Sequence, residues 1–101
     1  MSKNGMRPVH PGEILREDYL AELGMSVNAL AKALKVPTPR INDVVRERRG
    51  ISADTALRLA RYFDTTPQFW LNLQAAYDLR LAEIAAGSKI NREVSVMSKA
   101  A

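Results

Sequence analysis

The sequence predicts an all-α domain of five helices, and two observations lead to this prediction. Apolar residues recur at helical spacing in five separate stretches of the chain, and most of these stretches follow a residue suited to cap a helix. A chain of 101 residues is long enough for one core but not for two, and its 47% of hydrophobic residues indicates that it folds. We therefore expect one small helical domain, for which dimerisation would supply further buried surface.

The stretch 27–46 predicts the two short helices around which the rest of the chain is organised. Ser26 is suited to cap the first of them, because its hydroxyl can accept a hydrogen bond from an early N–H group. Thr38 is suited to cap the second, with Pro39 at the first helical position, where a missing N–H is tolerated. Residues 35–37 break the helical pattern between them. The inner faces are predicted to carry Leu30, Ala31, Leu34, Ile41, Val44 and Val45.

The spacing within this stretch resembles the helix-turn-helix of the Xre/Cro-like DNA-binding family. Counted from Val27, the family has apolar residues at the fourth, eighth, tenth, fifteenth and eighteenth positions. Its fifth position is Ala or Gly, since the two helices touch there, and Ala31 fits. The ninth is often Gly but is Lys35 here, and because a non-glycine residue at positive φ carries strain, we expect a turn of different form. The alternative is a pair of ordinary packed helices. The five apolar positions hold Leu30, Leu34, Val36, Ile41 and Val44.

Upstream of this pair, the sequence predicts a flexible arm over residues 1–10 and a first helix over residues 13–23. Gly24 follows as the stop signal. His10 is the only histidine and lies on the expected arm, with no obvious catalytic or metal-binding partner. The inner face of the first helix is predicted to carry Leu15, Tyr19 and Leu23, with Ile14 and Leu20 beside them.

Downstream, residues 53–63 predict a fourth helix with Ser52 as its cap, and residues 67–86 predict a fifth, capped by Thr66 and closed by Gly87. The inner face of the fourth helix is predicted to carry Ala56, Leu59, Ala60 and Phe63.

The predicted fifth helix is apolar almost all round, so one core cannot cover it. The simplest second partner is the same helix of another subunit; the alternative is one wide buried face with scattered exposed apolar residues. Residues 11–87 would then form the domain. Residues 88–101 would be either a frayed tail or a final segment whose structure depends on the dimer. The predicted dimer contacts are Leu71, Tyr77 and Leu81.

Charge is unevenly distributed, although the net charge is only +4. Residues 32–61 contain eight basic and three acidic side chains, whereas residues 13–22 contain four acidic side chains and one basic one. One part of the surface should therefore attract polyanions and another should repel them. The alternative is a pair of ordinary solvated faces, but the helix pair inside the basic stretch favours nucleic acid as the partner.

In the family that the pair resembles, the second helix enters the major groove with its N-terminal half nearest the base edges. An arginine there can donate two hydrogen bonds to guanine, and an asparagine can pair with adenine. Asp43 either accepts from cytosine or orients Arg40 or Arg46. The expected base-reading residues are Thr38, Pro39, Arg40, Asn42 and Asp43. The expected phosphate contacts are Lys35, Arg46, Arg48 and Arg49.

A second resemblance covers residues 7–83. The segments HPGEIL, SADTALRLA and FWLNLQ are similar to those of the HigA (VapI-type) antitoxins, a subfamily of Xre-like proteins. The resemblance implies a lambda-repressor-like domain and a homodimer that binds double-stranded operator DNA and represses its own operon. It also implies a complex with a HigB toxin, a RelE-like ribonuclease. The alternative is a solitary Xre-family transcriptional regulator without a toxin partner.

Charge suggests where such a toxin would bind. An enzyme that cleaves RNA needs a positive surface, and complementary charge speeds encounter and sets orientation. The acidic face of the first helix is therefore the first candidate. The alternative is that these acids only suit the helix dipole and keep DNA away from this side. The residues concerned are Glu13, Glu17, Asp18 and Glu22.

The composition argues against an enzyme. The chain has no cysteine, a single histidine and no cluster of carboxylates outside the first helix, so we expect no catalytic residues, no metal site and no cofactor. No apolar run approaches the ~18 residues that a membrane span needs. The start of the chain lacks the apolar core of a signal peptide, and we therefore expect a cytoplasmic protein without a membrane partner.

Overall fold

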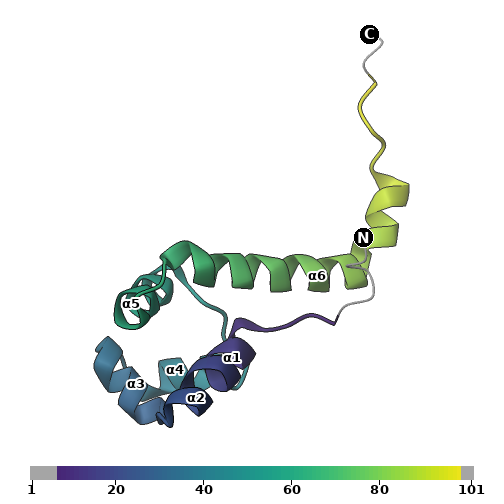
Figure 1. The fold of residues 1–101 in the computed structure, drawn as a ribbon. Coiled ribbons are helices and arrows are strands. Elements are labelled where there is room, and N and C mark those ends of the chain that lie inside the picture. The colour runs from purple at the N-terminus through teal and green to yellow at the C-terminus, as the bar shows by residue number, and fades with distance from the viewer. Residues whose placement is uncertain (1–6, 99–101) are drawn as a thin grey trace.

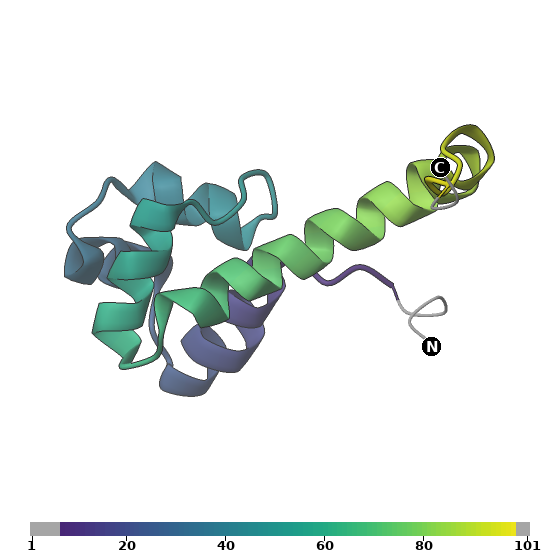
Figure 2. The same cartoon turned by 90° about the horizontal axis from the view of Figure 1, so that it is seen from above.

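The computed structural model describes residues 7–98, and over this range the chain is helical without strands (Figure 1). The prediction of an all-α fold is therefore confirmed. The last helix lies across the others and projects well beyond them, so the molecule measures 57 × 27 × 23 Å (Figure 2). The helices are α1 (Pro11–Ile14), η2 (Leu15–Leu20), α2 (Ala21–Leu23), α3 (Val27–Leu34), α4 (Thr38–Val45), α5 (Ala53–Phe63) and α6 (Pro67–Glu93).

The core lies where α6 covers the shorter helices. Trp70 of α6 is completely buried, and its indole N–H donates to the Thr65 hydroxyl at 2.9 Å. The ring of Tyr19 lies 5.1 Å from that of Trp70 and 4.7 Å from that of Phe63. These aromatic contacts join η2, α5 and α6 into one body. The remaining buried apolar residues are Leu15, Leu20, Leu30, Ala31, Leu34, Ile41, Val44, Val45, Ile51, Ala56, Leu59 and Ala60.

Most of the predicted capping residues form the predicted hydrogen bonds. The hydroxyl of Ser26 accepts from the Ala29 amide at 3.0 Å, and that of Ser52 accepts from the Thr55 amide at 3.2 Å. The hydroxyl of Thr66 likewise accepts from the Phe69 amide. At α4 the prediction was wrong: the cap position is Pro37, and Thr38 lies inside the helix without a capping bond. The reason is that Pro37 already holds the extended backbone that a cap position requires.

The turn between α3 and α4 also differs from the prediction. Lys35 adopts the left-handed conformation that glycine usually provides, with φ 61° and ψ 44°. The Val36 amide then donates to the Ala31 carbonyl at 3.0 Å, which satisfies one of the unpaired carbonyls at the end of α3. The expectation of a turn of different form was wrong, because the exposed lysine accepts a strain of about 1–2 kcal/mol at this position.

The first helix runs without interruption from α1 through η2 to α2. Its middle section is π-helical, which places Leu15 and Leu20, five residues apart, on the same buried face. Leu23 is 59% exposed, so its predicted place on the inner face was wrong. Regular α-helical spacing does not hold across a π-helical section, and the inward face therefore shifts along the sequence.

The segment before this helix is docked. Arg7 donates two hydrogen bonds to the Glu13 carboxylate, at 2.8 and 2.9 Å. His10 is 4% exposed, its Nδ1 accepts from the Gly12 amide at 2.8 Å, and its ring contacts that of Tyr77. The expected flexible arm was thus wrong for residues 7–10, because His10 caps α1 and fills a gap beside α6. Residues 1–6 of the expected arm lie outside the described residues.

The last helix is longer than the sequence suggested. It continues through Gly87 to Glu93, and the Lys89 ammonium lies 4.0 Å from the Glu93 carboxylate in its final turns. The predicted end at Gly87 was wrong, because a glycine inside a helix costs only about 1 kcal/mol and the turns around it compensate. Residues 88–93 therefore belong to α6, and residues 94–98 follow without regular structure. No helix in the described part of the chain is long and apolar enough to span a membrane.

The buried His10 makes stability depend on pH. Burial holds its pKa below the ordinary 6.5, against the opposing charges of Glu47 and Asp78 and alongside the positive charge of Arg16. The unfolded chain therefore binds more protons just below pH 6.5, and the free energy of unfolding should decrease as the pH falls from about 6.5 toward the folded pKa.

His10→Asn keeps a cap that can accept from the Gly12 amide but does not titrate. We expect urea unfolding to show that the free energy of unfolding of the wild type decreases as the pH is lowered from 7 to 5. The free energy of unfolding of the variant should stay nearly constant over the same range. An equal slope in both proteins would mean that His10 is not the titrating group.

Candidate nucleic-acid interface

Helix α4 has one buried side and one polar side. Ile41, Val44 and Val45 are buried against the domain. At helical spacing, Thr38, Pro39, Asn42 and Asp43 form one continuous strip on the side away from these residues, and none of the four is buried. Arg40 lies at the edge of this strip, next to α5. The structure thus places all five predicted base-reading residues on or beside a single face.

A basic loop follows α4 at the same end of the domain. Arg46, Arg48 and Arg49 are exposed, and Glu47 turns the backbone with a positive φ of 64°. The amides of Arg48 and Arg49 donate to the Asp43 carbonyl, at 2.8 and 3.2 Å. The loop is therefore tied to the helix that it follows.

The carboxylate of Asp43 contacts the same loop. It lies 4.0 Å from the Arg49 guanidinium and pairs with neither Arg40 nor Arg46, so the predicted orienting role toward those two residues was wrong. Asp43 and Arg40, three positions apart, are neighbours on the surface of α4, but the Arg40 guanidinium is bonded to Asp54 of α5 instead. Its predicted contact with cytosine stays a prediction.

The far end of the basic loop is held by α6. The side-chain oxygen of Gln74 accepts from the Ile51 amide at 2.6 Å, while the amide nitrogen of Gln74 donates to Asp78 at 3.0 Å. This contact is close, since a Cβ at Gly50 would lie 2.8 Å from the same Gln74 oxygen. The sequence analysis missed Gln74, which carries no local signal of this role.

The first helix supports α4 at its C-terminal end. The Arg16 guanidinium donates to the Val45 carbonyl and also lies 3.4 Å from Glu47 and 3.1 Å from Glu17. A cation at this position satisfies a free carbonyl and suits the negative end of the helix dipole. Arg16 was counted in the sequence only as the one base within an acidic stretch.

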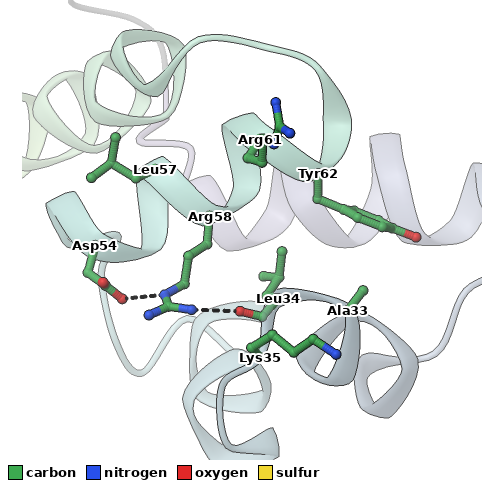
Figure 3. Close-up of a pocket in the computed structure, with 8 residues that line it drawn as sticks. All are labelled: Ala33, Leu34, Lys35, Asp54, Leu57, Arg58, Arg61 and Tyr62. Atoms are coloured by element: carbon green, nitrogen blue, oxygen red, sulfur yellow. Dashed lines mark hydrogen bonds and ion pairs between the residues drawn. The ribbon is translucent and has the colours of Figure 1, made fainter.

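A chain of charged contacts supports α4 at its other end. Arg40 donates to the Asp54 carboxylate of α5 at 2.6 Å, and Arg58 donates to the same oxygen at 2.8 Å. Arg58 also donates to the Leu34 carbonyl at the end of α3, at 2.9 Å (Figure 3). The Arg58 guanidinium, followed by that of Arg40, holds the pKa of Asp54 below its usual range. The sequence analysis did not predict a role for Asp54 or Arg58, although an acid and a base at i, i+4 indicate a possible ion pair.

Beside this chain of contacts, a surface groove of about 720 Å³ separates α3 from α5 (Figure 3). Lys35, at the end of α3, lines one side of this groove, and Arg58 and Arg61 of α5 line the other side. The predicted phosphate contact Lys35 is therefore exposed, but it lies on this groove and apart from the loop that carries the other three predicted phosphate contacts.

The acidic face of the first helix is partly neutralised within the chain. Glu13 is bonded to Arg7, and Glu17 lies 3.1 Å from Arg16. Asp18 and Glu22 are exposed and form no ion pair with another described residue. Among residues 7–98 no three His, Asp or Glu side chains lie close enough together to hold a metal ion.

The predicted dimer contacts on α6 divide into two groups. Leu71 packs against the core of its own chain, and Tyr77 contacts His10, so both are half-buried already. Leu81 is 41% exposed. Three large apolar side chains of α6 beyond Tyr77 are more exposed than Leu81, namely Leu79 at 62%, Ile84 at 59% and Ile90 at 48%.

Comparison with known proteins relates this geometry to a family. The family model described as Helix-turn-helix matches residues 15–70, which span η2 to the start of α6. Virulence-associated protein I of Dichelobacter nodosus is 64% identical over 81 residues, which cover 80% of this chain and 75% of that protein.

Two solved structures are similar over nearly the whole chain. The structure of Pseudomonas aeruginosa antitoxin HigA with the higBA promoter has a TM-score of 0.88 and 56% identity, and the match covers 91% of this chain and all of that one. The structure of antitoxin GraA in complex with its operator has a TM-score of 0.89 and 57% identity, and the match covers 97% of this chain and 99% of that one.

Proposed function

Because this chain belongs to the helix-turn-helix family, we propose that it is an antitoxin that represses its own operon and neutralises a RelE-like ribonuclease toxin. The observation that carries the proposal is the polar strip of α4 beside an anchored basic loop, on a backbone similar to two antitoxins solved with a promoter and an operator. An operator-binding repressor acts where the chromosome is, so we place the protein in the cytoplasm.

In the proposed complex, α4 enters the major groove and the loop follows the phosphate backbone. Asn42 is in the middle of the polar strip, where its amide can pair with adenine N6 and N7. Arg48 and Arg49 are exposed on a loop whose backbone is tied to Asp43, so their side chains approach phosphates from a fixed position. The readout residues and the phosphate residues are thus held by different elements and can be tested separately.

We propose further that the protein is a dimer through the projecting part of α6. The side of α6 that packs on its own domain carries Trp70 and Tyr77. It continues, at helical spacing, to Leu81 and Ile84, which are 41% and 59% exposed. A neighbouring hollow of about 280 Å³ lies between residues 7–9 and α6. A second α6 would bury this surface, and two-fold symmetry would place two α4 helices on half-sites about 34 Å apart.

The toxin is proposed to bind on the acidic side of the first helix. Since Glu13 and Glu17 are paired with arginines of the same chain, the charge left for a basic partner is carried chiefly by Asp18 and Glu22. The first helix contacts α4 through Gly12 and Arg16, next to the buried residues Val44 and Val45, so a toxin on the exposed side of the first helix need not cover the polar strip.

Asn42→Ala should weaken binding to the operator by about 1–3 kcal/mol and relax the preference at one base pair. Arg48→Ala should weaken binding to operator and random duplexes alike and reduce the steepness of the salt dependence, because one phosphate contact is lost. Fluorescence anisotropy at two or more salt concentrations measures both effects. Equal losses on both duplexes for both variants would contradict the separate roles.

Ile84→Glu should convert the dimer to monomers that bind a single half-site weakly, because the buried carboxylate would have no partner. Ala82→Glu is the matched control, since it adds the same charge to an exposed position on another side of α6. Sedimentation at micromolar concentration distinguishes the outcomes. A dimer that tolerates Ile84→Glu as well as it tolerates Ala82→Glu would place the interface elsewhere.

The antitoxin role is tested by co-expression with the product of the neighbouring gene. We expect a toxic ribonuclease whose growth arrest is relieved by this chain and whose complex with it dissociates as salt rises. The double variant Asp18→Lys and Glu22→Lys should weaken that complex at least tenfold, while operator binding in its absence persists. Undiminished complex formation would exclude this face, and a neighbouring product that neither binds nor arrests growth would leave a solitary repressor.

A further inference from the structure

We propose that Asp54 is a positioning residue for Arg40 and that, by aiming this side chain at a guanine, it sets the specificity of the operator at one base pair. The inference rests on the proposed DNA-binding function and adds to it a residue outside α4. Among the five predicted base-reading residues, only Arg40 lies at the edge of the polar strip. The orientation of its side chain therefore depends on the residue that binds its guanidinium.

The contact between Arg40 and Asp54 leaves one edge of the Arg40 guanidinium free to bind a base. The guanidinium of Arg40 meets Asp54 through Nη1 alone, at 2.6 Å. No other described side chain bonds to Arg40, and its Nε and Nη2 donors point along the edge not taken by Asp54. Two donors on one guanidinium edge are what the O6 and N7 atoms of guanine accept in the major groove.

Asp54 is itself fixed from behind. Arg58 donates through Nε to the same carboxylate oxygen and through Nη1 to the Leu34 carbonyl (Figure 3). Arg58 thus joins α5 to α3, while Asp54 joins α5 to α4 through Arg40. A carboxylate held by two arginines has little freedom to turn away. The arrangement also gives roles to three polar residues of the segment SADTALRLA, since Ser52 caps α5 while Asp54 and Arg58 form this bridge.

Stability alone does not explain the arrangement. The side chain of Asp54 is 53% exposed, and exposed ion pairs contribute little to folding. A carboxylate beside a DNA-reading helix also repels phosphates, so it lowers affinity for every sequence. In return, Asp54 holds the long, flexible Arg40 side chain in one orientation before DNA binds. This preorganisation raises the affinity only for a duplex that carries the matching base.

The test compares operator and random duplexes for Asp54→Ala. Loss of the carboxylate should leave affinity for random DNA unchanged or higher and should lower the ratio of operator to random affinity about tenfold, which corresponds to one good base contact. Substitution of each operator base pair in turn should show that the lost preference is confined to one G·C pair. Asp64→Asn, at the other end of α5, removes the same charge and should leave the ratio unchanged.

A double variant separates positioning from a general effect of charge. In an Arg40→Ala background, Asp54→Ala should cause no further fall in the ratio, because there is no arginine left to aim. A ratio that Asp54→Ala does not alter, or that it lowers equally with and without Arg40, would overturn the inference. A wild-type protein that does not distinguish operator from random DNA would instead contradict the proposed function itself.

Discussion

The first helix and α4 approach each other so closely at Gly12 that no side chain fits between them. A Cβ at this position would lie 1.9 Å from the carbonyl oxygen of Val44, well inside any allowed contact. The approach explains the order of residues at the start of the domain: His10 caps the helix, Pro11 opens it, and Gly12 allows the backbones to touch. The contact of Arg16 with the Val45 carbonyl depends on this spacing, because Arg16 lies one turn farther along the same helix.

From that position the domain holds α4 on several sides. Arg16 satisfies the carbonyl at its C-terminal end, the small Ala31 lets α3 pack close to it, and Asp54 holds Arg40 near its N-terminal end. Gln74 then fixes the loop that follows. A reading helix held in this way does not need to be ordered by DNA, so the free energy of binding is not spent on folding it. The same framework separates the proposed base readout on α4 from the proposed phosphate contacts on the loop and from the acidic face of the first helix.

Local signals in the sequence predicted most elements well, although the Thr38 cap and the helix end at Gly87 were local predictions that were wrong. The remaining errors and omissions concern contacts between distant residues. Residues 53–63 were predicted to the residue, because the Ser52 cap and the apolar spacing are both local. The outward strip of α4 followed from the same spacing. The π-helical section Leu15–Leu20 and the buried position of His10 depend on partners elsewhere in the chain, and no local sequence pattern predicts them. The pairing of Arg40 with Asp54 likewise joins two helices, so the sequence offered only the local Asp43 as a possible acidic partner.

The account requires that α4 is already formed and fixed in the absence of DNA, and native-state hydrogen exchange of the free protein measures this directly. The amides of Val44 and Val45 should exchange only through global unfolding, with the same opening free energy as the amide of Leu59 in the core of α5. Exchange at Val44 and Val45 that is much faster than at Leu59, and that slows to the core value only when operator DNA is added, would show that DNA orders the reading helix and would contradict the account.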